Sequence, residues 1–369
     1  MKKKLQQDHY RITAADKPEA EQYLQGRGAQ INTKNKFQKE ETTREFIEGI
    51  DDWSEDNLPT QYIEQQSKTI VNKVESPDVG MAYSMNAYAG CEHGCIYCYA
   101  RNAHEYWGYS AGLDFERKII VKVNAAQLLR RQLMNPRWEV MPIMLSGNTD
   151  CYQPAENKYR LTRGLLEVCS EFNQPVGILT KNSGILKDKD LLASMASRNL
   201  VSAMVSVTSF NEDLRRVMEP RTTTASQRIK VIEELSKAGV KTGVMLGPMI
   251  PGLNDHEMQR IMKAASDAGA TFTAYTFIRL NGAIKLLFHD WLYKNFPDRA
   301  DKVWHQIEES HAGKVNDSRW GLRMRGEGTV AELIEQQYRT YGRLYNMNED
   351  RYSLDTTIFR RPGQQGTLF

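Results

Sequence analysis

Three cysteines, Cys91, Cys95 and Cys98, lie within one short loop in a Cys-x3-Cys-x2-Cys spacing. Gly90 and Gly94 border the first two cysteines and permit the tight backbone that three converging thiolates need. Such a loop can supply three corners of an iron–sulfur cubane and leaves the fourth iron without a protein thiolate. An open coordination position is typical of a catalytic metal, whereas structural sites are closed. The spacing therefore predicts a catalytic metal centre.

Structural zinc and a disulfide are the alternatives for these cysteines. A structural zinc site usually takes four ligands. His93 lies between the first two cysteines, but no second cysteine pair follows, because Cys151 and Cys169 are isolated in the sequence. An odd total of five cysteines, three of them crowded together, favours metal binding over a disulfide framework in a large intracellular chain. Zinc stays open as the less favoured alternative.

The composition is that of a soluble globular enzyme, with 40% hydrophobic and 26% charged residues among 369. The formal net charge of +3 neither requires nor excludes a nucleic-acid partner. No run of about 18 apolar residues is present, and no apolar segment follows the basic start, so neither a membrane span nor a signal peptide is expected. We therefore expect a cytoplasmic protein.

Six short β-rich apolar runs alternate with amphipathic helical segments in the middle of the chain. The predicted strands are 82–88, 142–146, 176–180, 201–207, 240–246 and 271–278. This alternation predicts an α/β fold with a parallel sheet and right-handed crossovers, although periodicity alone does not separate an open sheet from a barrel. The expected units are a polar, partly disordered N-terminal arm with a short helix (1–80), the α/β domain (81–280), a helical C-terminal extension (281–348) and a flexible tail (349–369).

The motifs around the cysteines resemble those of the radical S-adenosylmethionine (SAM) superfamily. The flanking residues are similar to the branch that includes spore photoproduct lyase, often described as DNA repair photolyase-like, and within it to an uncharacterised bacterial radical SAM group. The resemblance runs from about Gly26 to about Gly328. The motifs that carry it are Asn86-Ala87-Tyr88-Ala89-Gly90-Cys91, Tyr97-Cys98-Tyr99-Ala100-Arg101, Gly112-Leu113-Asp114-Phe115, Thr149-Asp150, Thr180-Lys181, Glu219-Pro220-Arg221 and Ile250-Pro251-Gly252-Leu253-Asn254-Asp255.

The resemblance implies a partial TIM-like barrel of six β/α units. It also implies a [4Fe-4S] cluster on the three cysteines, whose open iron binds the amino and carboxylate groups of SAM. Reduction by a protein such as flavodoxin or ferredoxin would then cleave SAM to methionine and a 5′-deoxyadenosyl radical. The branch favours DNA repair or nucleic-acid modification. A protein or small-molecule substrate, and a non-catalytic iron–sulfur or zinc protein of the replication machinery, are the alternatives.

Polar residues at the ends of the predicted strands are the candidate SAM contacts, because barrel enzymes place their chemistry at the carboxyl ends of strands. The turn after the second strand has Ser-Gly-Asn-Thr-Asp in place of the family's usual Gly-Gly-Glu. By position, Lys181 and Ser206 match residues suited to the SAM carboxylate, and Arg221 or Arg228 offers a bidentate clamp. Ser206 could instead satisfy backbone groups, and Arg221 could pair with Glu219. The full candidate set is Gly147, Asn148, Thr149, Asp150, Lys181, Ser206, Arg221 and Arg228.

Tyr97 and Tyr99 flank the last cysteine of the motif and are candidates for hydrogen-atom relay, although shielding of the cluster is favoured. Spore photoproduct lyase carries a hydrogen-donating cysteine in the turn after the second strand, and the matching position here is Gly147. Cys151 lies four residues later and is a candidate substitute, but a packing cysteine is the favoured interpretation. We therefore expect no repair of spore photoproduct by the same route.

The chain ends in Gln365-Gly366-Thr367-Leu368-Phe369. This pentapeptide resembles the peptide with which bacterial replication and repair proteins bind the sliding clamp, where an apolar pair enters a pocket and a Gln amide bonds at its rim. A chance terminal sequence is the alternative. If the motif is functional, it would bring the protein to DNA.

Overall fold

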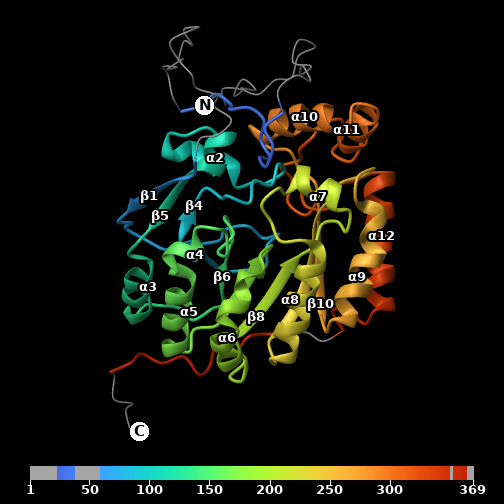
Figure 1. The fold of residues 1–369 in the computed structure, drawn as a ribbon. Helices are drawn as coiled ribbons and strands as arrows, with labels where there is room; N and C mark the ends of the chain where they lie inside the picture. Colours follow the sequence, from blue (N-terminus) through green and yellow to red (C-terminus); the bar gives the residue numbers. More distant parts are fainter. Residues whose placement is uncertain (1–22, 38–58, 350–351, 364–369) are drawn as a thin grey trace, which may run out of the picture.

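The computed structural model describes residues 23–37, 59–349 and 352–363 (Figure 1). Its main sheet has seven strands in the order β10-β9-β8-β7-β6-β3-β2. Six neighbouring strands are parallel, and β2 is antiparallel to β3. The strands are β2 (Val71–Lys73), β3 (Tyr83–Met85), β6 (Ile143–Leu145), β7 (Val176–Thr180), β8 (Val201–Ser206), β9 (Lys241–Met249) and β10 (Phe272–Phe277).

The six parallel strands correspond to the six predicted strands, and they follow one another in chain order across the sheet. Strands β2 and β10 form its two edges in the described part of the chain, so the sheet is an incomplete, TIM-like barrel. A smaller sheet in the order β1-β5-β4 lies beside it. It consists of β1 (Gln61–Gln65), β4 (Tyr88–Ala89) and β5 (Lys118–Lys122).

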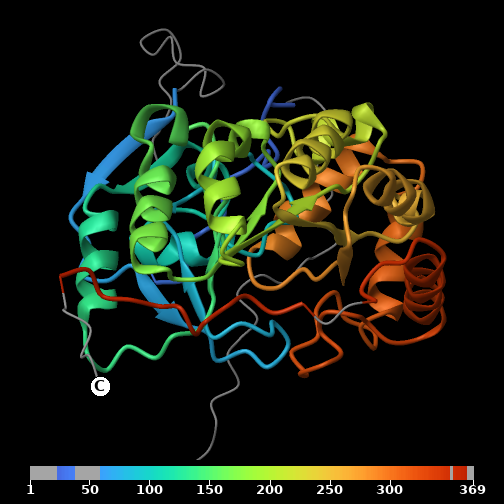
Figure 2. The ribbon, with the colours of Figure 1, turned by 90° about the horizontal axis from the view of Figure 1, so that it is seen from below.

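Helices form an outer layer along the curved sheet, as Figures 1 and 2 show. This follows from the parallel topology, because each crossover helix must cover the sheet. The layer comprises α3 (Ala125–Met134), α5 (Leu161–Phe172), α6 (Lys189–Ala196), α8 (Ala225–Lys237) and α9 (Met258–Asp267). The shorter helices are α1 (Arg101–His104), α2 (Leu113–Arg117), α4 (Glu156–Tyr159) and α7 (Glu212–Met218), of which α2 and α7 lie in the upper part of Figure 1. No helix in the described ranges is long and apolar enough to cross a membrane.

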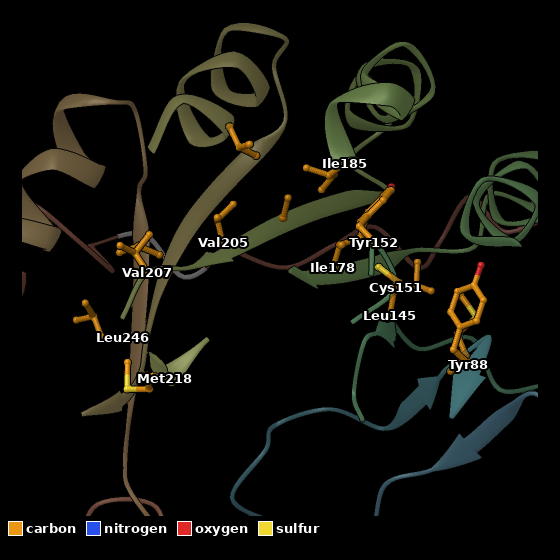
Figure 3. Close-up of a cluster of buried hydrophobic side chains, with 14 of the residues drawn as sticks. Tyr88, Leu145, Cys151, Tyr152, Ile178, Ile185, Val205, Val207, Met218 and Leu246 are labelled. Carbon is orange, nitrogen blue, oxygen red and sulfur yellow. The ribbon is translucent and has the colours of Figure 1, made fainter. Parts of the chain in front are cut away.

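The core lies between the sheet and the layer of helices. Figure 3 shows Leu145, Ile178, Val205 and Leu246, from four neighbouring strands, among these buried side chains. They alternate with residues on the other face of the sheet, as the two-residue repeat of a strand requires. The predicted helical extension is present as α10 (Ile284–Asn295), α11 (Ala300–Glu309) and α12 (Thr329–Leu344).

The N-terminal arm and the tail differ from the sequence-based expectation. Residues 61–65 and 71–73 of the arm form β1 and β2, and residues 27–30 are buried. The described parts of the arm contain no helix, and its other residues lie outside the described ranges. The flexible-tail prediction is wrong for residues 352–363, because their backbone bonds to the outer layer: Asp355 N–H to Asn199 O and Arg360 N–H to Phe172 O, both at 2.9 Å.

Candidate active site

A buried ion pair holds the cysteine loop in place. Arg101, at the start of α1, donates to the carbonyl oxygens of Cys95 (2.9 Å) and Gly94 (3.0 Å) within the loop, and to the carboxylate of Glu116 at 2.5 Å. Its remaining donors bond to the carbonyl oxygens of residues 111 and 112. The side chains of Arg101 and Glu116 are 0% exposed. Because every guanidinium donor has an acceptor, the pair fixes the loop backbone at little desolvation penalty.

The N-terminal segment closes over the outside of this loop. The backbone N–H groups of Gly28 and Ala29 donate to the Glu116 carboxylate at 3.2 and 2.8 Å. A Cβ at Gly28 would lie 1.7 Å from the carbonyl oxygen of Gly94, so only glycine allows the two backbones to approach this closely. The buried segment of the N-terminal arm is therefore part of the site.

The three cysteines of the loop are free thiols that lie close together. Cys91 and Cys95 are buried, with 6% and 7% exposure, and Cys98 is half-buried. Burial, followed by Asp150 and the other two thiols, raises the pKa of Cys91 well above its usual range. Thiols in this state need a bound cation to become thiolates.

No three His, Cys, Asp or Glu side chains converge on a single ion in the described ranges. A cubane differs from a single ion because each cysteine binds a separate iron, so its ligands stand further apart. His93 is unavailable as a fourth metal ligand. Its Nδ1 lies 3.4 Å from the Asp150 carboxylate and its Nε2 lies 3.1 Å from the Asn182 amide. The three cysteines therefore suit an iron–sulfur cluster better than a four-ligand zinc site.

The turn after β6 is built around Asp150. One carboxylate oxygen of Asp150 accepts from Thr180 Oγ1 and Tyr152 N–H, and the other accepts from the N–H of Lys181 and lies next to His93. Burial raises the pKa of Asp150, but His93 and the backbone donors outweigh it, and the pKa falls to about 2. The carboxylate is fully engaged within the protein. The Asp150 side chain joins the cysteine loop to β7, and its predicted contact with SAM stays a prediction.

The rest of that turn is also bonded internally. Thr149 Oγ1 donates to the carbonyl oxygen of Tyr88 at 2.9 Å, which leaves its oxygen only as an acceptor for SAM. The backbone N–H groups of Asn148 and Thr149 donate to Asn86 Oδ1 at 2.9 and 3.2 Å. A Cβ at Gly147 would lie 2.8 Å from Ser84 Cβ, so this position has no room for a side chain. Within the turn, the Asn148 side chain is left as a candidate.

A second buried ion pair lies on the other side of the loop. Glu219 accepts from Tyr97 Oη and from Arg228 Nη2, the latter at 2.6 Å, and both members of the ion pair are about 0–1% exposed. Arg228 also donates to Thr223 O, Ser206 O and Thr222 Oγ1. Burial raises the pKa of Glu219, but Arg228 and Lys181 lower it to about 2. Arg228 is therefore engaged by protein groups, and its role as a SAM clamp stays a prediction.

Arg221 packs beside the loop and does not pair with Glu219. Its backbone N–H donates to His93 O at 3.3 Å and its Nε donates to Gly26 O at 3.2 Å. The alternative pairing with Glu219 is wrong, because Arg228 occupies that carboxylate. The segment around Glu219 and Arg221 therefore packs against one side of the cysteine loop.

Lys181 and Ser206 lie at the carboxyl ends of adjacent parallel strands, β7 and β8. The Lys181 ammonium lies 5.9 Å from the centre of the Tyr97 ring. Burial lowers the pKa of Lys181, but Cys95 and Glu219 outweigh this effect, and the pKa is raised above its usual value. The amine is therefore held as a cation near the cysteine loop. The hydroxyl of Ser206 and that of Thr208 are buried without a hydrogen-bond partner in the described ranges. Ser206 therefore does not satisfy backbone groups, and its hydroxyl is available to a ligand.

Tyr99 and Cys151 have different surroundings. Tyr99 is 55% exposed, and its hydroxyl donates to the carbonyl oxygen of Gly147 across the open end of the barrel. Cys151 is 2% exposed and lies in the core cluster of Figure 3, next to Leu145 and Tyr152. Burial raises the pKa of Cys151 well above its usual range. Its surroundings agree with the packing interpretation rather than with hydrogen-atom donation.

Comparisons with known proteins match the central part of the chain. The profile of the Radical SAM superfamily matches residues 85–265. An uncharacterised protein of Mycobacterium tuberculosis is 34% identical over 238 residues, which cover 64% of this chain and 70% of that protein. The chain belongs to the radical SAM superfamily. It is therefore a radical SAM enzyme, with the cysteine loop inside the matched region.

Two further likenesses place this radical SAM enzyme among its relatives. The radical SAM Nalpha-GlyT isomerase of Pseudomonas phage M6 is 26% identical over 231 residues, covering 61% of this chain and 46% of that protein. A solved structure of a spore photoproduct lyase variant superposes with a TM-score of 0.50 at 15% identity, covering 77% of this chain and 79% of that one. The latter likeness confirms the fold.

Several residues that build this radical SAM site had no predicted role in holding the cysteine loop. They are Asn86, Arg101, Glu116, Gln153 and Glu219, of which Gln153 donates to Gly90 O at 3.1 Å and accepts from Glu92 N–H at 3.0 Å. Asn86, Arg101 and Glu219 stand in motifs that carry the family resemblance, which was the only available signal. Glu116 carries no such signal, because its role depends on a partner 15 residues away.

Proposed function

We propose that Cys91, Cys95 and Cys98 bind a [4Fe-4S] cluster and that SAM binds beside it, at the carboxyl ends of β7 and β8. The observation that carries this proposal is a loop of three neighbouring free thiols next to a buried cation and an unpartnered buried hydroxyl. When bound, the cluster and SAM supply one-electron chemistry that removes a hydrogen atom from a substrate.

The residues of the chain have distinct tasks in this proposal. The Lys181 ammonium and the Ser206 hydroxyl bind the SAM carboxylate, because a cation and a donor on adjacent strands suit its two oxygens. The Glu219–Arg228 pair holds Tyr97 over Lys181 and thereby excludes water from the cluster. The Arg101–Glu116 pair keeps the loop in one conformation.

We further propose that the substrate is a nucleic acid. The motifs shared with the spore photoproduct lyase branch and the clamp-like C-terminal peptide support this substrate class. The substrate is not spore photoproduct repaired through a cysteine after the second strand, because Gly147 has no room for a side chain and Cys151 is buried in the core.

Anaerobic reconstitution tests the cofactors. The protein is loaded with iron and sulfide, reduced with dithionite and given SAM, and 5′-deoxyadenosine is measured. The intact protein should form it, and Cys91→Ala, Cys95→Ala and Cys98→Ala should not. Cys169→Ala is the matched control, since Cys169 is a fully buried free thiol on α5, outside the cysteine loop. Equal activity in the loop variants and the control would refute the assignment.

The substrate class needs an isotope experiment. DNA, RNA and protein fractions from cells grown on deuterated medium are supplied separately, and deuterium is measured in the 5′-deoxyadenosine. Transfer from DNA or RNA supports the proposal. Transfer from the protein fraction alone would favour a protein substrate and contradict it.

We also propose two protein partners. The electron donor is a flavodoxin or ferredoxin, since a buried cluster needs a one-electron donor. The second partner is the sliding clamp, bound through Gln365–Phe369, which lies outside the described residues. Deleting these five residues should abolish clamp capture in a pull-down, and failure of the intact protein to bind would end this part of the proposal.

A further inference from the structure

An unsatisfied cation lies just beyond the last strand of the barrel. Arg279 follows β10 and is half-buried. Its Nε is buried without a hydrogen-bond partner in the described ranges, and Nη1 contacts only the Met324 sulfur, at 3.8 Å. Burial, together with the like charge of Arg323, lowers the pKa of Arg279. A guanidinium in such a place is costly unless an anion joins it.

The nearest carboxylate is already occupied. Asp78 accepts from Arg323 Nε at 2.5 Å, and Arg323 also donates to Ser76 Oγ at 2.6 Å. No described carboxylate forms an ion pair with Arg279, as the ion pairs of this region show. Two neighbouring arginines therefore stand against a single carboxylate, and that carboxylate pairs with Arg323. The excess of positive charge favours binding of a further anion.

The helix that follows the cysteine loop is bonded to the segment that follows Arg279. Asn102, four residues after Cys98 on α1, donates from its amide to the carbonyl oxygen of Asn281 at 2.8 Å and accepts from Ala283 N–H at 3.0 Å. An anion on Arg279 would thus be held near the cluster loop, at the open end of the barrel.

Groups suited to a base lie near the cation. Tyr99, which is 55% exposed, and Arg323 both lie within electrostatic reach of Arg279. Trp320 is 56% exposed, and the Arg323 guanidinium lies 3.8 Å from its ring centre. The Asn281 Oδ1, two residues beyond Arg279, is buried without a partner in the described ranges. Exposed aromatic rings stack on bases, and an Asn amide bonds to base edges.

We propose that Arg279 binds a phosphodiester group of a single-stranded nucleic-acid substrate and positions the neighbouring nucleotide over the cysteine loop. This inference rests on the proposed function and names how its substrate is held. The planar guanidinium offers a bidentate contact to phosphate oxygens. A phosphodiester suits the site better than an isolated carboxylate because two exposed aromatic rings, Tyr99 and Trp320, lie near the cation and can stack on the attached base.

Binding of fluorescein-labelled oligo(dT) and oligo(rU) tests the proposal by anisotropy, with the full chain carrying its reconstituted cluster. Arg279→Gln should weaken binding about tenfold and reduce the salt-dependence slope by about one ion. Arg279→Lys should recover part of the lost affinity, because lysine keeps the positive charge but lacks the paired N–H donors of the guanidinium. The matched control is Arg343→Gln, an exposed arginine in the last turn of α12. The chain just after α12 bonds to Thr271 at the amino end of β10, whereas Arg279 follows the carboxyl end of that strand. The control substitution should change binding less than twofold.

Two further measurements make the result decisive. Thermal unfolding of Arg279→Gln identifies a variant that has lost its fold, in which case Arg279→Lys decides. Thymidine monophosphate and inorganic phosphate are tested as competitors, and displacement of oligo(dT) only by millimolar concentrations of either supports a polynucleotide site.

Equal binding by Arg279→Gln and the intact protein overturns the inference, as does tight binding of free phosphate without oligonucleotide. SAM cleavage is measured in the same preparation of intact protein. Formation of 5′-deoxyadenosine together with an unaffected Arg279→Gln would remove this inference alone, whereas absence of cleavage in a loaded sample would remove the proposed function.

Discussion

Gly28→Ala tests how the N-terminal segment supports the cysteine loop. The new methyl group would lie 1.7 Å from the Gly94 carbonyl oxygen, so the segment must move away. Overpacking of this kind costs about 1–3 kcal/mol. The shift also weakens the bonds from Gly28 and Ala29 to the Glu116 carboxylate. A hydrogen bond to a charged group is worth about 1.5–3 kcal/mol, so the loss of one brings the total to about 3–6 kcal/mol.

That loss is large against a typical unfolding free energy of about 5–15 kcal/mol. Denaturant unfolding of the apo chain measures it, and the iron content after reconstitution measures its effect on the loop. We expect Gly28→Ala to unfold at lower denaturant and to take up less iron. Gly26→Ala is the control, because its position has a φ of +73° but no atom within 4 Å of the added Cβ. It should cost about 1 kcal/mol. If the two variants lost equal stability and iron, the close-approach argument would be refuted.

Three further predictions concern buried groups. Glu219→Gln leaves Arg228 as an unpaired buried charge and should cost about 3–5 kcal/mol at pH 7 by denaturant unfolding. Because the pKa of Glu219 falls from 4.5 to about 2 on folding, its stabilisation is present above pH 4.5 and is lost as the pH falls toward 2. The difference between the variant and the intact protein should therefore shrink across that window, and a constant difference would contradict the assigned pKa. Cys151→Ala should lower stability by about 1–3 kcal/mol yet leave SAM cleavage intact, and loss of cleavage in a folded variant would restore Cys151 as a catalytic candidate. Ser206→Ala should raise the KM for SAM without reducing iron content, and an unchanged KM would remove Ser206 from the SAM site.

The barrel strands could be predicted because each is a short apolar run with a helical segment after it. The run Ile119-Ile120-Val121 of β5 is also a short apolar run with a helix after it, but it was not predicted as a strand. It follows closely on the cysteine loop and pairs outside the main sheet. Strands β1 and β2 carried none. They are polar and largely exposed, and β1 forms through parallel pairing with β5. Pairing of this kind is set by the tertiary fold rather than by the local sequence.

The site could be predicted only where the type and position of single residues indicate their role. The cysteine spacing located the loop, and strand ends located Lys181 and Ser206. Composition and spacing do not reveal which charged groups are already paired, so Asp150 and Arg228 were taken for ligand contacts although each is engaged by protein groups. The packed segment 352–363 was missed for a related reason, since its backbone bonds leave no hydrophobic pattern.

Electron paramagnetic resonance of the anaerobically purified and reduced protein, recorded before and after addition of SAM, tests the central claim most directly. We predict iron and sulfide in the ratio of a cubane, a signal of a reduced [4Fe-4S] cluster and a change of that signal when SAM binds the iron that Cys91, Cys95 and Cys98 leave open. Zinc in place of iron, or a cluster signal that SAM leaves unchanged, would contradict the account.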